Sequence, residues 1–203
     1  MPTPHPVHLE VSGDLRRSRL TSFFRPILAI PHLIWLSIWG IAAVFAVIAN
    51  WFATLFAGRS PEGLHRFLAH YLAYATKVFA YLHLLAEPFP PFDGRPGYEV
   101  ALVVAPPERQ NRATVAFRLI LAIPVLIVMH VLTYLMGVLA LVSWVVSVVL
   151  GRLPHGLRSL GLWCLRFQQQ TAAYTHLITQ RYPSFDVDGG DPAPATGELS
   201  PAS

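Results

Sequence analysis

The sequence predicts an all-α membrane protein built from two tandem repeats of about 93 residues, and three observations carry that prediction. Hydrophobic residues make up 54% of the chain and charged residues 13%, against roughly 25% charged residues in a soluble domain. Residues 31–57 and 124–150 carry no charge, and about 20 apolar residues suffice for a helix to cross a bilayer. Residues 24–93 align without a gap to residues 117–186, with 23 of 70 positions identical. Internal repeats are common in membrane proteins.

Each repeat is expected to contain the same elements in the same order. The first repeat covers residues 1–95 and the second residues 96–188, and a tail at 189–203, rich in Pro, Gly, Ala and Ser, is expected to be disordered. Apolar residues alternate over residues 7–11 and again over 100–104. Such alternation is typical of half-buried strands. It predicts two short extended segments at the cytoplasmic face, either paired as strands or acting as linkers.

A basic interfacial segment and a long apolar helix follow in each repeat. Pro31 and Pro124 mark a bend or a helix start between the two, because proline lacks an N–H and restricts the residue before it. Arginines stand at both ends of the apolar runs, and a guanidinium presents a two-pronged donor to a phosphate. We therefore predict lipid-headgroup contacts for these arginines, with non-specific snorkelling as the alternative; they are Arg25, Arg118, Arg59 and Arg152.

An amphipathic second helix is predicted over residues 61–86 and 154–179, with a polar stripe along each. Lys77 and Arg166 would lie well inside the bilayer if these helices crossed it. A charge at the bilayer centre costs about 2.5–3.5 kcal/mol on insertion scales. These helices therefore either cross with the stripe facing a partner helix or water, or lie in the interface.

Two membrane topologies remain open. In one, each repeat is a helical hairpin, which gives four crossings and places both termini in the cytoplasm by the positive-inside rule. In the other, each apolar run is a re-entrant hairpin that turns near Gly40 or Gly137. The first is favoured, because two full crossings need about 40 residues and each run is shorter than that.

Few residues point to chemistry. His83 and His176 are equivalent under the repeat and could face each other to hold a metal or haem, or they could be polar residues near the headgroups. Cys164 is the one cysteine, which excludes an intrachain disulfide and a thiolate metal cage. The chain lacks a P-loop, a G-x-S-x-G motif and a G-x-G-x-x-G motif. We predict neither enzyme activity nor a cofactor.

Three motifs resemble one known family. The first repeat contains LAIPH at residues 28–32, LFAGRSPEGL at 55–64 and PFPPF at 88–92. Their order and spacing resemble a bacterial domain-of-unknown-function family, DUF4389, in both repeats. The resemblance implies a multi-pass bacterial membrane protein and brings no known activity.

The second repeat departs from this motif. Val125 replaces His32, and the aromatic residue usual after Gly-Arg is Ser60 in the first repeat and Leu153 in the second. The second repeat is therefore expected to keep the structure without the role of those positions.

Taken together, these features predict an integral protein of the bacterial cytoplasmic membrane. A non-enzymatic accessory or scaffold subunit, or a lipid-organising protein, is the favoured function. The alternatives are a small transporter or channel lined by the polar stripes, and a haem or metal redox subunit. The net charge of +4 fits anionic headgroups, so the expected partners are membrane lipids, with a membrane protein or a second copy as further candidates. Nucleic acid is not expected, because the arginines flank apolar runs.

Overall fold

A computed structural model gives the fold of the protein over residues 5–13, 18–92 and 97–185. The tail predicted at 189–203 lies outside these described residues. The elements follow one another as two similar halves, and the second half has an extra short helix. They are β1 (Val7–Val11), α1 (Arg19–Ala57), α2 (Glu62–Leu82), β2 (Val100–Val104), α3 (Arg112–Ala116), α4 (Arg118–Leu150) and α5 (His155–Thr175).

The two apolar runs form long continuous helices. α1 has 39 residues and α4 has 33, which corresponds to about 58 and 50 Å. Each ends at a glycine in the left-handed region, Gly58 with φ 74° and Gly151 with φ 67°. Both helices continue through Gly40 and Gly137, so the alternative with re-entrant turns at these glycines is wrong. A glycine inside a helix costs only about 1 kcal/mol, less than breaking the backbone hydrogen bonds of an apolar segment.

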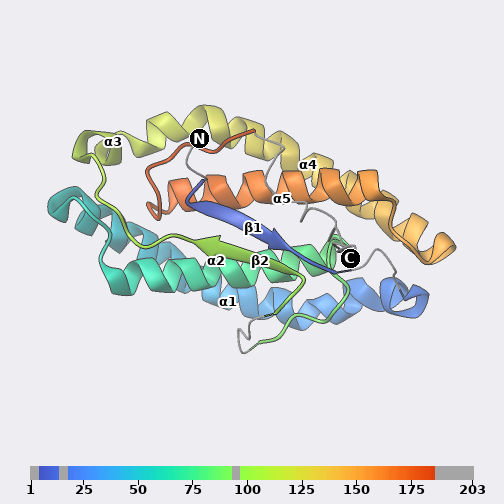
Figure 1. The fold of residues 1–203 in the computed structure, drawn as a ribbon. Helices are drawn as coiled ribbons and strands as arrows, with labels where there is room; N and C mark the ends of the chain where they lie inside the picture. Colours follow the sequence, from blue (N-terminus) through green and yellow to red (C-terminus); the bar gives the residue numbers. More distant parts are fainter. Residues whose placement is uncertain (1–4, 14–17, 93–96, 186–203) are drawn as a thin grey trace, which may run out of the picture.

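The helices form two antiparallel hairpins, α1 with α2 and α4 with α5 (Figure 1). α2 and α5 lie side by side in the centre of this view, and α1 and α4, which also contact each other, lie along its two long edges. β1 and β2 pair antiparallel, with Leu9 opposite Leu102, so the expected strands are confirmed as a pair. They lie across α2 and α5 (Figure 1). Because β1 comes from the first repeat and β2 from the second, the sheet joins the two repeats.

Both repeats contribute to the larger of two hydrophobic clusters in the described part of the chain. Leu68 and Leu72 of α2 belong to the same buried cluster as Leu165 and Phe167 of α5, and Val100 of β2 joins them from the sheet. The two repeats therefore fold as one body.

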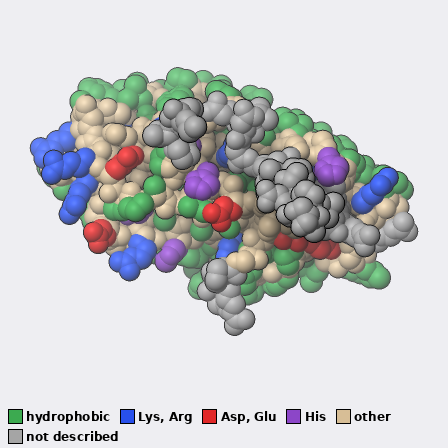
Figure 2. All heavy atoms as spheres, viewed as in Figure 1, with side chains coloured by type: hydrophobic (Ala, Val, Ile, Leu, Met, Phe, Trp, Pro, Cys, Tyr) green, Lys and Arg blue, Asp and Glu red, His purple; other side chains and the backbone are tan. Residues whose placement is uncertain are grey.

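The outer helices are apolar over most of their circumference. α1 buries only a narrow stripe at heptad-like spacing, whose buried members are Ser22, Arg25, Ala29, His32, Leu36, Ala43, Asn50 and Thr54. By length and composition, Leu20–Ala57 and Arg118–Leu150 could each cross a membrane. Figure 2 shows charged side chains and histidines over the sheet face and at the ends, with hydrophobic side chains along the two long edges. This distribution supports membrane association.

Candidate functional site

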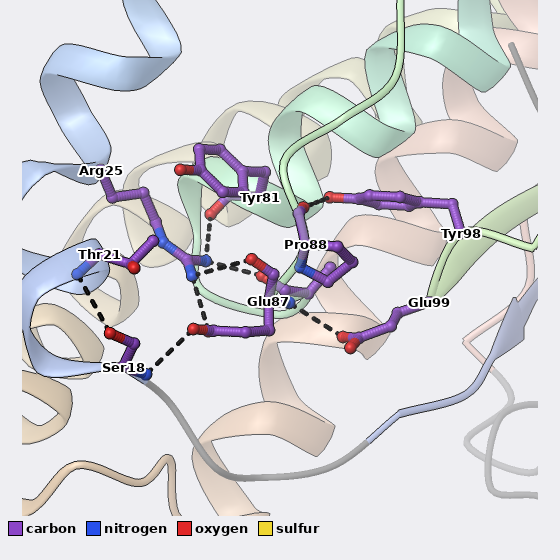
Figure 3. Close-up of polar contacts among 9 residues, drawn as sticks. Ser18, Thr21, Arg25, Tyr81, Glu87, Pro88, Tyr98 and Glu99 are labelled. Atoms are coloured by element: carbon purple, nitrogen blue, oxygen red, sulfur yellow. Dashed lines mark hydrogen bonds and ion pairs between the residues drawn. The ribbon is translucent and has the colours of Figure 1, made fainter.

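An extensive polar cluster surrounds Arg25 of α1, a residue that is 0% exposed. Its Nη1 donates to the carbonyl oxygens of Tyr81 (2.9 Å) and Ala86 (2.7 Å), and its Nη2 forms an ion pair with Glu87 Oε2 at 2.8 Å. The guanidinium carbon also lies 4.4 Å from the centre of the Tyr81 ring. Figure 3 shows Arg25 reaching from α1 into the chain at the end of α2. All of these partners are protein groups.

The end of α2 explains why an arginine is needed there. Leu84 adopts a left-handed conformation (φ 61°), and the N–H of Leu85 bonds the carbonyl of Ala80 at 2.8 Å, a closure typical of helix C-termini. The last carbonyls of a helix lack internal partners and carry the negative end of its dipole. Arg25 supplies both the donors and the positive charge that this end lacks.

Glu87 extends the cluster to two further elements. Its Oε1 accepts from the N–H of Ser18 at 3.0 Å, and its own N–H donates to Glu99 Oε2 at 2.9 Å. The hydroxyl of Tyr98 donates to the carbonyl of Pro88 at 2.8 Å. The start of α1, the end of α2 and the segment leading into β2 are thus held together (Figure 3).

The second repeat repeats this arrangement around Arg118. Its guanidinium carbon lies 4.2 Å from the centre of the Tyr174 ring, and its Nη1 donates to the carbonyl of Thr179 at 3.3 Å. Leu177 takes the left-handed conformation (φ 59°), and Gln110 accepts from Nη2 in place of a carboxylate. Arg118, Tyr174 and Leu177 each stand 93 residues after Arg25, Tyr81 and Leu84, so the cluster belongs to the repeat.

This geometry corrects two of the four predicted headgroup arginines. Arg25 and Arg118 are buried and donate hydrogen bonds to protein carbonyls, so they have no free surface for a lipid phosphate. The sequence placed them correctly at the start of the apolar run but did not show that they lie on the buried stripe. Arg59 and Arg152 are exposed, and their contact with headgroups stays a prediction.

The structure separates the two histidines proposed as a metal or haem pair. His176 lies at the end of α5 beside Tyr71, with ring centres 6.5 Å apart. Tyr71 precedes His83 by 12 residues on α2, or about 18 Å. The pairing is therefore wrong, because antiparallel helices carry equivalent C-terminal residues at opposite ends. Within the described ranges no three His, Cys, Asp or Glu side chains are grouped to hold a metal ion.

Two buried polar groups on α1, His32 and Asn50, were not among the predicted site residues. The Nδ1 of His32 lies 2.7 Å from the Tyr74 hydroxyl, and its ring stacks on Phe92 with centres 4.1 Å apart. The second repeat has Val125 and Phe167 at the matching positions. The His32-to-Val125 difference was visible in the sequence, but its coupling to Tyr74 depends on how α1 packs on α2.

Asn50 is the other group, and it connects the two repeats. Its Nδ2 donates to the carbonyl of His176 at 2.9 Å, and its Oδ1 accepts from the Ser60 hydroxyl at 2.6 Å. Both Asn50 and Ser60 are buried. A single asparagine side chain therefore forms hydrogen bonds with both the end of α5 and the turn after α1.

The environment of His176 predicts a pH-dependent stability. Burial lowers its pKa from 6.5 to about 4, so the folded protein keeps it neutral while the unfolded chain takes up a proton below pH 6.5. Stability should therefore fall with decreasing pH, by about 2 kcal/mol from this residue between pH 7 and 5. Thermal unfolding in neutral detergent at both pH values measures the difference.

His176→Gln is the test variant for this loss, and it should remove that share of the pH dependence. His5, His65 and His83 also have pKa values lowered by burial, so a smaller dependence should remain. Identical pH profiles for the variant and the native protein would contradict the assignment to His176.

Comparison with known proteins finds one family. The family model for a domain of unknown function, DUF4389, matches residues 19–93 and again residues 112–186. The two matches cover both helical hairpins, each from the start of its first helix to the segment after its second. No curated protein and no solved structure matches the chain.

Proposed function

The chain belongs to the DUF4389 family, and from this premise we propose that it is a non-enzymatic, lipid-organising protein of the bacterial cytoplasmic membrane. In this proposal α1 and α4 lie in the plane of one leaflet, and no helix crosses the bilayer. The position of the sheet along α2 and α5 is the observation that carries the proposal.

β1 and the residue that follows it lie along more than half of the length of α5. Gln170 Nε2 donates to the carbonyl of Val7 at 3.0 Å, and Arg158 Nη2 donates to that of Ser12 at 2.7 Å. These two contacts lie 12 residues apart on α5, or about 18 Å. If α5 crossed the bilayer, β1 would lie at hydrocarbon depth with the exposed Glu10 on it. Open sheet edges do not occur in contact with lipid hydrocarbon, so α5 is better placed in the interface, and β2 argues likewise for α2.

The exposed apolar surface also runs the full length of α1. Leu20 near its start is 72% exposed and Phe56 near its end is 74% exposed, and the two lie about 54 Å apart along the helix. A hydrocarbon core about 30 Å thick can hold both ends only if the helix lies flat or tilts steeply. Lying flat also leaves the charged sheet face in water.

A lipid-organising role follows from this asymmetric insertion. Two long helices in one leaflet take up area there and none in the opposite leaflet, as with interfacial amphipathic helices whose binding depends on curvature. The transporter alternative is less well supported, because Gln170 and Arg158 of the polar stripe are bonded to the β1 segment. The redox alternative lacks its histidine pair.

We expect three positions on one face of α1 to lie at the same membrane depth. Ile27, Phe45 and Phe56 are exposed and share a face by helical spacing, with the outer two about 43 Å apart along the axis. Single cysteines at these positions, in a Cys164→Ala background, would carry nitroxide labels in reconstituted vesicles. Accessibility to oxygen against a polar nickel complex reports the depth of each label.

Equal depths support the in-plane arrangement, whereas a crossing helix would place Ile27 and Phe56 on opposite sides of a deep Phe45. Glu10→Cys on the sheet is the water-exposed control. The same vesicles, imaged at rising protein content, should become smaller, and an unchanged size distribution would count against lipid organisation.

A further inference from the structure

We propose that one end of the molecule binds the phosphate of an anionic phospholipid through Arg59, Arg109 and Arg112, called here the basic end. The inference rests on the proposed function and deepens it by naming the lipid class and the residues. Neither repeat forms the basic end alone, because Arg59 comes from the first and the other two from the second.

Backbone pairing brings the three arginines together. Arg59 and Arg109 form an isolated antiparallel bridge, and the N–H of Gln110 donates to the carbonyl of Gly58 at 2.9 Å. Arg112 begins α3 and reaches back over this turn, since its Nε lies 3.6 Å from the point where a Cβ on Gly58 would stand. Two arginines on paired backbone and a third beside the same turn therefore start from one small region of the surface.

The segment that carries Arg109 is anchored in the core. Gln110, which is buried, donates from Nε2 to the carbonyl of Leu177 at 2.7 Å and accepts from Arg118. Asn111 caps α3 by accepting from the N–H of Ala113 at 2.9 Å. The backbone that carries Arg109 and Arg112 is therefore fixed before a ligand binds, which reduces the entropy lost on binding.

The guanidiniums of the basic end have unused binding capacity. All three arginines are exposed, and none of them forms an ion pair within the described part of the chain. The nearby carboxylate of Glu108 accepts from the Thr179 hydroxyl at 3.3 Å, and Glu62 lies in the first turn of α2. Figure 2 shows Lys and Arg side chains gathered at the end where Figure 1 places α3 and the α1–α2 connection.

Apolar side chains next to the basic end favour a phospholipid over a free phosphate ester. Phe56 precedes the Gly58 turn and is 74% exposed, and Phe117 follows α3 and is 61% exposed. Guanidiniums suit a phosphate, and aromatic side chains suit the boundary between headgroups and acyl chains. The arginines can therefore contact the phosphate of a lipid while the two phenylalanines contact its acyl chains. This is expected where a helix lying in the membrane plane ends at an anionic leaflet.

Binding of short-chain lipids to the full chain in neutral detergent micelles tests the proposal. The probes are dioctanoyl phosphatidylglycerol, dioctanoyl phosphatidylcholine and glycerol 3-phosphate, and thermophoresis measures each affinity. We expect phosphatidylglycerol to bind more tightly than phosphatidylcholine. Replacing all three arginines with glutamine should lower the phosphatidylglycerol affinity about tenfold or more, because charge-assisted hydrogen bonds are lost. Arg109→Gln alone should give part of this loss.

Arg66→Gln is the matched control, since Arg66 is exposed near the start of α2 but lies outside the basic end. An equal loss in Arg66→Gln would overturn the proposal in favour of general surface charge. Glycerol 3-phosphate binding as tightly as the lipid would overturn the choice of a phospholipid. If the nitroxide labels on α1 lie at equal depth but the arginine substitutions leave the phosphatidylglycerol affinity unchanged, only the lipid site is rejected. If the label depths show that α1 crosses the bilayer, the proposed function itself is rejected.

Discussion

Replacing Arg25 with methionine should lower the free energy of unfolding by about 3 kcal/mol, the low end of the cost of breaking a buried ion pair, because the Glu87 side chain is 27% exposed. The carbonyls of Tyr81 and Ala86 would lose their donors, and Glu87 would lose its counterion. Methionine keeps much of the side-chain volume, so the loss would come mainly from these polar groups. Unfolding in neutral detergent, followed by near-UV circular dichroism, measures the change.

The repeat supplies a parallel test and a control for the Arg25 prediction. Arg118→Met should be destabilising for the same reason, because Arg118 holds the end of α5 as Arg25 holds that of α2. Arg59→Met should change stability by no more than about 0.5 kcal/mol, since exposed substitutions usually do. If Arg25→Met unfolded like the native protein, the end of α2 would not depend on this cluster.

The repeat and the long apolar helices could be predicted because both can be seen in the sequence without knowing how the elements pack. Identity at a fixed offset shows a duplication, and an uncharged run predicts a long helix whatever its surroundings. Whether such a helix stands or lies in a bilayer depends on what packs against it. In this protein the decisive neighbour is the sheet, whose strands come from different repeats, and no local pattern in either strand predicts where the pair lies.

The direction in which Arg25 points was harder to predict than its position. An arginine beside an apolar run favours the headgroups by hydropathy alone. The spacing along the helix indicated the opposite direction. Ser22, Arg25 and Ala29 lie on one face of α1, and that face is buried. Tyr81 and Tyr174 gave a second signal, because polar aromatic residues kept in both repeats mark the partners of the two buried arginines.

Asn50→Ala should lower the free energy of unfolding by about 2–4 kcal/mol, because two buried groups lose their partner at once. The carbonyl of His176 would lose its donor and the Ser60 hydroxyl its acceptor, and each unpaired buried group costs about 1–3 kcal/mol. The matched control is Ser143→Ala at the equivalent position of the second repeat, which is also buried. It should cost less, since among the residues that the structure describes no side-chain hydrogen bond joins Ser143 to the other repeat.

A double-mutant cycle separates the hydrogen bonds of Asn50 from its packing. With Asn50 present, Ser60→Ala leaves Oδ1 without its strongest donor, whereas in the Asn50→Ala background the serine hydroxyl has already lost its acceptor. Ser60→Ala should therefore cost less in the variant than in the native protein, and the difference is the coupling energy. Additive losses would mean that the two side chains act independently. Asn50 would then contribute to the connection between the repeats through the carbonyl of His176 alone.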